Sequence, residues 1–106
     1  MKLTPMRGEI WLADLGMVGK TRPALVVSVV SEDCDRDMVC IVPRTTAIQG
    51  TRFEVPHQGR GFDDGAFDAQ GVWSVPDVRL LRRLSVADGM TLARVEDALR
   101  AWLGLA

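Results

Sequence analysis

Hydrophobic and polar residues alternate along Glu9–Asp14, whose sequence is E-I-W-L-A-D. A period of two is typical of a half-buried strand. The stretch Ala24–Val30 is instead a continuous apolar run rich in valine, which predicts a central strand. Further short strands are predicted at Met38–Val42, Thr51–Val55, Gly71–Val75 and Val78–Leu81, the last of which either continues its predecessor or stands alone. Short strands at this spacing predict a small barrel or sandwich.

Three polar or glycine-containing segments separate these strands. Leu15–Lys20 holds two glycines and is predicted to form a hairpin loop, and Ser31–Asp37 is an acidic loop. Pro56–Gly65 is rich in Gly, Asp and Gln and contains the single histidine of the chain. We expect this third segment to be a mobile loop.

The periodicity changes in the last twenty residues. Thr91 is a suitable N-cap, Gly104 a suitable helix end, and Ser85–Gly89 is predicted to form a short helical turn. Between the cap and the glycine, one helix face carries Leu92, Val95, Leu99, Trp102 and Leu103.

Aromatic side chains divide into two expected groups. Trp11 and Trp73 on strands and Trp102 on the helix face are expected to lie mostly in the core. Phe62 and Phe67 flank a polar acidic segment and are expected to be freer.

Composition narrows the class of protein. The chain of 106 residues is 47% hydrophobic and 25% charged, and it is predicted to form one domain, 1–106. It has no apolar run of membrane-spanning length and no secretory signal, so a cytoplasmic location is expected. The two cysteines, Cys34 and Cys40, are not expected to form a disulfide, and no metal site is expected. The net charge of −1 argues against a generally basic nucleic-acid binder, although a local basic face stays open.

The most informative segment is the entrance to the valine-rich strand. Arg22 stands directly before Pro23, which restricts the arginine to an extended backbone. Its guanidinium is a planar fork of donors that suits phosphate. The strand Met38–Val42 ends in P-R-T-T, Pro43–Thr46. Two neighbouring strands with these ends predict a small anion-binding corner.

These segments, in this order, resemble the MazF/PemK family of toxins. The resemblance rests on R-G-E-I-W-L-A-D-L (Arg7–Leu15), T-R-P-A-L-V-V-S (Thr21–Ser28), V-C-I-V-P-R-T-T (Val39–Thr46) and V-E-D-A-L-R-A-W-L-G-L (Val95–Leu105). It implies a mainly β fold, a small SH3-like β-barrel with a C-terminal helix, and a homodimer. It also implies a toxin of a type II toxin–antitoxin system, an endoribonuclease that cuts single-stranded mRNA without a cofactor and is blocked by a MazE-like antitoxin.

Two family residues carry over directly, the arginine of the Arg-Pro motif at Arg22 and the threonine of the Pro-x-Thr motif at Thr45. Departures leave the cut sequence and the general base open. The first hairpin loop lacks a Glu-Gln pair that many relatives have, and Asp77 stands where many have glutamine. Pro76 and Ser74 occupy positions at which some relatives use an aspartate and an arginine.

RNA cleavage without a metal needs groups that these residues could supply. The 2′-hydroxyl attacks the adjacent phosphorus, and preorganised donors stabilise the added charge. Arg22 suits that role, and Thr45 can donate to a phosphate oxygen or align the 2′-hydroxyl. Asp77 and His57 are the two candidates for the general base. Further RNA contacts are expected from Lys20, Thr21, Arg44, Thr46 and Arg79, with Arg44 facing away from Thr45 as a secondary phosphate ligand.

Two other functions fit the same features. A CcdB-like gyrase poison shares the barrel and uses a tryptophan near its C-terminus, a position that Trp102 matches superficially. A catalytically inactive relative would act only as a binding module. Incubation with a long RNA in EDTA separates all three, because only the ribonuclease makes discrete cuts without metal.

Overall fold

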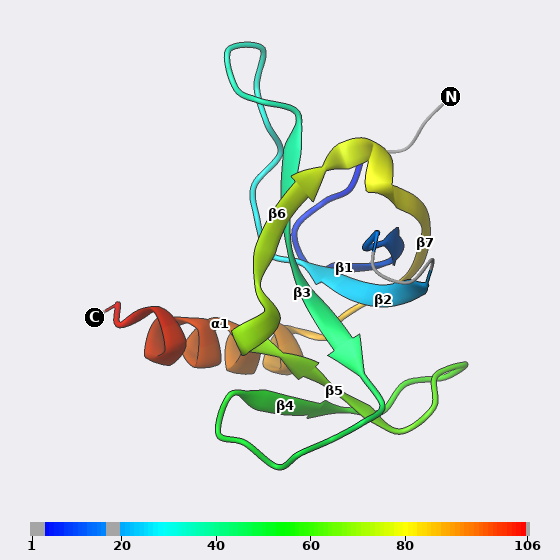
Figure 1. Cartoon of the computed structure of the whole chain (residues 1–106), viewed down its shortest axis with the longest axis vertical. Coiled ribbons are helices and arrows are strands. Elements are labelled where there is room, and N and C mark those ends of the chain that lie inside the picture. The colour runs from blue at the N-terminus through cyan, green and yellow to red at the C-terminus, as the bar shows by residue number, and fades with distance from the viewer. Residues whose placement is uncertain (1–3, 17–19, 106) are drawn as a thin grey trace.

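Seven antiparallel strands and one C-terminal helix make up the fold in a computed structural model, which describes residues 4–16 and 20–105 (Figure 1). The sheet order is β4-β5-β3-β2-β1-β7, and β6 pairs with β3 beside this path. This arrangement confirms the predicted mainly β, barrel-like fold with a C-terminal helix. The elements are β1 (Glu9–Asp14), β2 (Thr21–Val26), β3 (Met38–Thr45), β4 (Glu54–His57), β5 (Gly65–Asp68), η1 (Ala69–Gly71), β6 (Trp73–Pro76), η2 (Asp77–Arg79), β7 (Leu80–Val86) and α1 (Gly89–Leu103).

The central strands are buried on both faces, which explains the continuous apolar runs. Ile10, Leu25 and Val42 point to one cluster, which also holds Phe67 of β5 and Val95 of α1. Their sequence neighbours point to the other face, where the second cluster holds Trp11, Ala24, Ile41, Val75 and Leu80. Successive side chains on a strand alternate between faces, so β1, β2 and β3 supply both cores at once.

Several strand predictions are confirmed, and others are wrong. β1 has the predicted bounds, and β3 begins at the predicted Met38. β4 begins later than the predicted Thr51 and runs two residues into the segment predicted as a loop, Pro56–Gly65. β5 begins at the last residue of that segment and was not predicted; pairing with both β3 and β4 stabilises its four residues of weak strand preference. β7 runs through residues for which a short strand and a helical turn were predicted, since it pairs with β1 along its length. The predicted hairpin loop Leu15–Lys20 lies partly outside the described residues.

The helix begins three residues before the expected region. Asp88, not Thr91, is the N-cap, and its carboxylate accepts a hydrogen bond of 2.7 Å from the Thr91 amide. Gly104 ends the helix in the left-handed conformation, with a φ of 70°, as predicted. Among the described residues, no helix is long and apolar enough to cross a membrane.

The predicted placement of the aromatic residues is partly wrong. Trp11 is buried as expected, but Trp73 is 42% exposed and Trp102 is 43% exposed. Phe67, which was expected to be free, is completely buried in the cluster under α1. β6 pairs with β3 alone, and α1 extends past the sheet at its C-terminal end, so neither tryptophan is fully covered (Figure 1).

Candidate functional site

Arg22 lies at the point where three pockets meet. The first, of about 370 Å³, is lined by Arg22, Thr45, Thr46 and the loop residues Gly61, Phe62 and Asp63; we call it the loop pocket. The second, the tryptophan pocket of about 520 Å³, is lined by Leu15, Lys20, Arg22, Gln70, Val72 and Trp73. The third, the acidic pocket of about 210 Å³, is lined by Arg22, Thr45, Glu54 and Asp68 among others. Arg22 therefore lines all three of these pockets.

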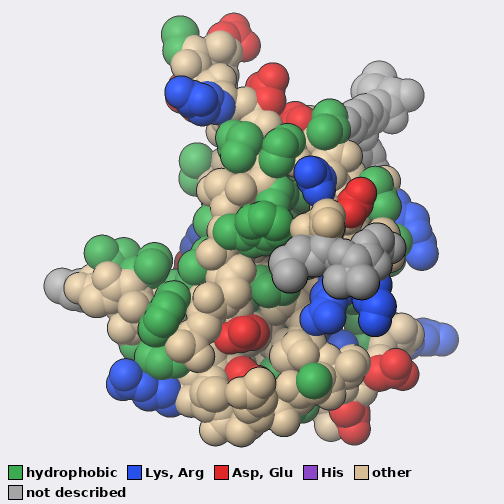
Figure 2. Space-filling view, viewed as in Figure 1, with side chains coloured by type: hydrophobic (Ala, Val, Ile, Leu, Met, Phe, Trp, Pro, Cys, Tyr) green, Lys and Arg blue, Asp and Glu red, His purple; other side chains and the backbone are tan. Residues whose placement is uncertain are grey.

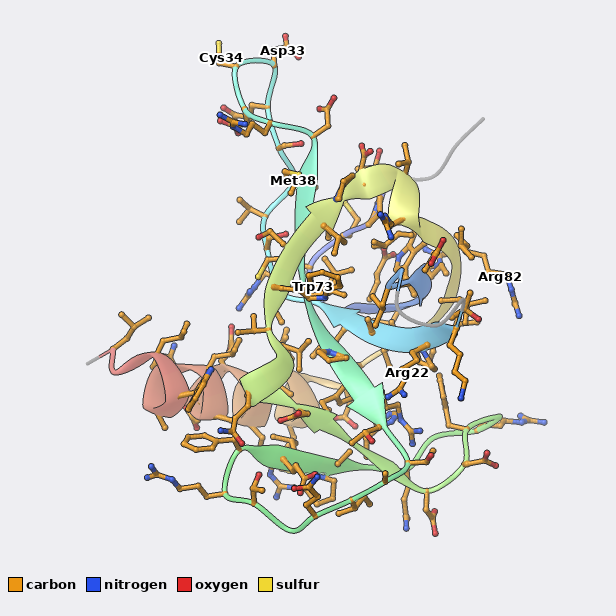
Figure 3. All side chains as sticks on the ribbon, viewed as in Figure 1. Arg22, Asp33, Cys34, Met38, Trp73 and Arg82 are labelled. Carbon is orange, nitrogen blue, oxygen red and sulfur yellow. The ribbon has the colours of Figure 1, made fainter. Side chains whose placement is uncertain are left out.

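Strand register brings Arg22 and Thr45 together. β2 pairs with β3 with Ala24 opposite Pro43 and Leu25 opposite Val42. The pairing ends there, and Arg22 and Thr45 each stand two residues beyond it on their own strand. Both side chains line the loop pocket and the acidic pocket. The corner predicted from the Arg-Pro and Pro-x-Thr segments is present as a structural feature. Figure 3 shows Arg22 at the end of β2 that lies beside the tip of β3.

The two residues differ in how their polar atoms are used. Arg22 is exposed, and among the residues that the structure describes it makes no side-chain hydrogen bond or ion pair. The hydroxyl oxygen of Thr45 accepts a hydrogen bond of 3.0 Å from the Ala47 amide. A hydroxyl can accept and donate at once, so the Thr45 O–H is available to a ligand.

Arg44 does not lie where the sequence suggested. It was expected as a secondary phosphate ligand facing away from Thr45, but it is only 4% exposed, and it lines the loop pocket together with Arg22 and Thr45. Its Nε donates to His57 Nδ1 at 2.9 Å, and its Nη2 donates to the backbone carbonyls of His57 and Asp63 at 2.8 Å and 2.5 Å. Burial lowers the pKa of Arg44, and the carboxylates of Asp63 and Asp64 oppose that effect.

Neither candidate base lies in a pocket that Arg22 lines. His57 is the last residue of β4, not part of a mobile loop, and its ring packs 4.9 Å from the Phe67 ring. Asp77 begins η2, where its amide donates to the Asp37 carbonyl and its side chain faces a separate small pocket. The carboxylates that do line pockets with Arg22 are those of Asp63, Glu54 and Asp68.

The remaining predicted RNA contacts are spread more widely. Lys20 lines the tryptophan pocket and Thr46 the loop pocket. Thr21 lies opposite Asp14, at the start of the β1–β2 pairing. The Arg79 guanidinium lies beside Gly16, at the end of β1, and lines none of the three pockets.

Sequence reasoning missed Trp73 and Gln70 as pocket residues. Trp73 looked like an ordinary apolar residue of a strand, because it alternates with buried Val75. Its neighbours Val72 and Ser74 also fit a half-buried strand, so no signal in the sequence marks its exposure.

Comparison with known proteins decides the family. The model of the PemK-like, MazF-like toxins of type II toxin–antitoxin systems matches residues 6–103. The chain belongs to this family. The resemblance found in the sequence is thereby confirmed.

Solved structures agree with this assignment. A chain of a MazE–MazF crystal structure from Deinococcus radiodurans is 27% identical with a TM-score of 0.82, covering 99% of this chain and 100% of that chain. An endoribonuclease from mycobacterial species, in complex with its cognate antitoxin, is 24% identical with a TM-score of 0.82, covering 96% and 97%. The Mycobacterium tuberculosis toxin MazF-mt6 is 21% identical with a TM-score of 0.80, covering 92% and 98%. The last two comparisons support the fold alone.

Proposed function

We propose that this toxin is a metal-independent endoribonuclease that cuts single-stranded mRNA within a short sequence and so stops translation. The observation that carries the proposal is Arg22, an exposed guanidinium without an intramolecular partner among the described residues, which lines two pockets together with Thr45. Membership of the PemK-like, MazF-like toxin family supports it. Its substrate is cytoplasmic, so we place the toxin in the cytoplasm.

The reaction needs no group beyond the RNA and the protein. The 2′-oxygen forms a bond to the adjacent phosphorus as its proton is removed. The bond from phosphorus to the 5′-oxygen breaks, and that oxygen takes up a proton. The products are a 2′,3′-cyclic phosphate and a 5′-hydroxyl. Arg22 donates from its fork to two nonbridging oxygens, whose charge grows in the transition state. Thr45 donates its hydroxyl hydrogen to the same phosphate.

The tryptophan pocket suits the nucleotide next to the cut. Trp73 offers an exposed ring on which a base can stack, and Lys20 offers a cation for a backbone phosphate. Single-stranded RNA can present splayed bases to such a surface, whereas duplex RNA cannot. This pocket shares Arg22 with the loop pocket, so a strand can pass from one to the other across the reacting phosphate.

A second copy of the chain is proposed to bind beside this path. Figure 2 shows hydrophobic side chains gathered on the side of the molecule that carries β6 and the C-terminal end of α1. Exposed residues there include Trp102, Leu103 and Leu105. β6 pairs with β3 alone among the described strands, so its other edge is open to pairing. We therefore propose a homodimer. Sedimentation that shows a stable monomer at micromolar concentration would contradict it.

The antitoxin is proposed to compete for the same surface. A MazE-like partner with an acidic, disordered tail can place a carboxylate against Arg22 and apolar side chains against Trp73. Structures of MazE–MazF complexes from Deinococcus radiodurans support a partner of this class. Saturating antitoxin should abolish RNA binding. Unchanged RNA binding and cutting would refute a shared surface.

The deciding experiment is incubation of the purified protein with a long RNA in EDTA. Discrete fragments are expected, and their 5′-hydroxyl ends should accept labelled phosphate from polynucleotide kinase without prior phosphatase treatment. The 3′ ends should resist ligation to a labelled nucleotide by RNA ligase until acid opens the cyclic phosphate and a phosphatase removes the resulting phosphate. An intact RNA would refute the proposal. Trapping of gyrase on cut DNA in a parallel reaction would instead support a gyrase poison.

A further inference from the structure

Two of the buried polar side chains of this protein contact each other beside the candidate site. In the described part of the chain, Glu9, Arg44 and His57 are the buried charged or titratable residues. Glu9 lies in β1 and is bonded by Trp11 and Arg83, far along the sheet from the loop pocket. Arg44 immediately precedes Thr45, and His57 is its principal partner.

Arg44 ties both ends of one loop to the end of β3. The loop comprises residues 58–64, between β4 and β5. Arg44 holds the start of the loop through His57 Nδ1 and the His57 carbonyl, and it holds the far end through the Asp63 carbonyl. The Phe62 ring covers the guanidinium, with its centroid 5.0 Å from the central carbon. Four contacts from one side chain therefore fix the shape of the loop.

This loop is one wall of the loop pocket. Gly61, Phe62 and Asp63 line that pocket together with Arg22, Arg44 and Thr45. Gly65, directly after the loop, is packed so tightly that an added Cβ would lie 2.6 Å from Arg44 Nη1 and 2.7 Å from the Thr45 carbonyl oxygen. The position of the wall thus depends on where the Arg44 guanidinium sits.

The Arg44–His57 bond requires a neutral imidazole. Nδ1 accepts the proton-bearing Nε of Arg44, so the imidazole proton must be on Nε2. A second proton can only go to Nδ1, which would then face a donor and place a second cation beside the guanidinium. Protonation of His57 and the Arg44–His57 hydrogen bond therefore exclude each other.

Charges around the pair act in both directions. Burial lowers the pKa of His57 below its ordinary value, the charge of Arg44 lowers it further, and Asp88, in the turn before α1, acts to raise it. From the loop, Asp63 and Asp64 act on Arg44. Arginine keeps its charge throughout the working range of a protein, so His57 is the group of this pair that titrates.

We propose that Arg44 and His57 are a positioning pair that holds the 58–64 loop as a wall of the Arg22–Thr45 pocket and releases it when His57 is protonated. The inference rests on the proposed RNA cleavage for its effect on activity. The closed loop itself is a property of the folded protein and can be tested without RNA. His57 in this role acts through Arg44 on the shape of the pocket and not as the general base.

The first test uses the single histidine of the chain, which makes its NMR signals unambiguous. At pH 7.5 the ring should be the Nε2–H tautomer, and its pKa should lie below the ordinary value of about 6.5. Amide hydrogen exchange in residues 58–64, corrected for the intrinsic effect of pH, should rise at least tenfold as His57 is protonated, while exchange in β1 and β2 stays constant. An Nδ1–H tautomer, or a loop whose corrected exchange does not respond to pH, would overturn the proposal.

The second test compares variants in cleavage and in loop exchange. Arg44→Met should raise loop exchange at pH 7.5 and lower the cleavage rate at least tenfold. Arg52→Met removes the same charge from an exposed side chain that packs on Phe53 and lines none of the three pockets, and it should stay within threefold of the wild type. Equal cleavage by the two variants would refute a positioning role, because both lose one positive charge.

His57→Asn tests the pH dependence of cleavage, which would not change if His57 had only a structural role. The asparagine Oδ1 occupies the place of Nδ1 and can accept from Arg44, but it does not titrate. Wild-type cleavage should fall as the pH falls through the pKa of His57, and this acid limb should be absent in His57→Asn. If the folded variant keeps the limb, another group causes it and the switch is refuted. If His57→Asn does not fold, or the wild type cuts no RNA, the NMR and exchange measurements on the wild type still decide whether the pair closes the loop.

Discussion

Replacement of Arg22 is the sharpest test of the proposed chemistry. Arg22→Ala removes the guanidinium that lines all three pockets. Loss of one preorganised donor to developing charge costs about 10²–10³ in kcat, and the fork of Arg22 presents two donors. We therefore expect a fall of at least about a hundredfold, measured as single-turnover cleavage of a labelled RNA in EDTA.

The same substitution should leave the fold intact. Arg22 is exposed and makes no side-chain hydrogen bond or ion pair within the described residues, and such surface changes alter the unfolding free energy by no more than about 0.5 kcal/mol. For a domain of this size that corresponds to a shift in Tm of about 2–4 °C or less. Thermal unfolding can therefore be used to show that the loss of activity is not a loss of structure.

Two controls separate charge from geometry. Arg22→Lys keeps the charge but not the planar fork, so it should recover little of the rate. Arg82→Ala removes one positive charge from an exposed residue of β7 that lines none of the three pockets, and it should stay near the wild-type rate. A folded Arg22→Ala protein that cuts within fivefold of the wild type would remove Arg22 from the mechanism.

Three further predictions concern the site and its support. Thr45→Ala should lose more single-turnover activity than Thr46→Ala, because Thr45 lines both the loop pocket and the acidic pocket, whereas Thr46 lines the loop pocket alone of the three. The reverse order would assign the hydrogen bond to the phosphate to Thr46. Gly65→Ala should destabilise the protein by about 1–3 kcal/mol in urea unfolding, because its Cβ meets the Thr45 carbonyl. Gly89→Ala meets nothing within 4 Å and should be neutral or stabilising by up to about 1 kcal/mol; equal effects would contradict the packing. Burial acts to raise the pKa of Glu9, but hydrogen bonds from Trp11, Met6 and Arg83 together hold that pKa below its usual value of 4.5. The Glu9 carboxylate therefore stabilises the fold while it is charged, and the Tm difference between wild type and Glu9→Gln should narrow as the pH falls through the pKa of the folded state. A constant difference would show that the Glu9 charge does not contribute.

Local patterns were enough to predict the parts of the fold that local chemistry determines. The alternation of Glu9–Asp14 predicts β1, and the apolar runs predict β2 and β3, because these strands are buried on one or both faces. The Arg22–Pro23 pair predicts a strand entrance, since the proline restricts the backbone on both sides of its own nitrogen. The corner formed by Arg22 and Thr45 follows from those strands once they pair in register.

Residues whose environment is made by distant parts of the chain could not be placed in this way. His57 stands in a polar, glycine-rich segment and is buried only because Arg44 and Phe67 reach it from other strands. Trp73 has the alternation of a core residue, yet it is exposed because nothing in the described chain covers that part of β6. Whether these two side chains are buried depends on which distant strands pack around them, and a few neighbouring residues in the sequence do not reveal it.

Two of the three buried charged or titratable residues in the described chain, Arg44 and His57, lie beside the candidate site. Burying a charge is costly unless good geometry compensates for it, so a buried arginine needs a reason for its retention. Glu9 has a structural one, because its carboxylate accepts from Met6, Trp11 and Arg83 and so joins β1 to β7. Arg44 joins β3 to a loop that adds only the partly buried Phe62 to the edge of the core, and that loop lines a pocket together with Arg22. Departures from local folding rules are expected at functional sites, where stability is not the only requirement. The position of Arg44, one residue before Thr45, therefore argues that its cost is tolerated for the shape of the pocket and not for the stability of the barrel.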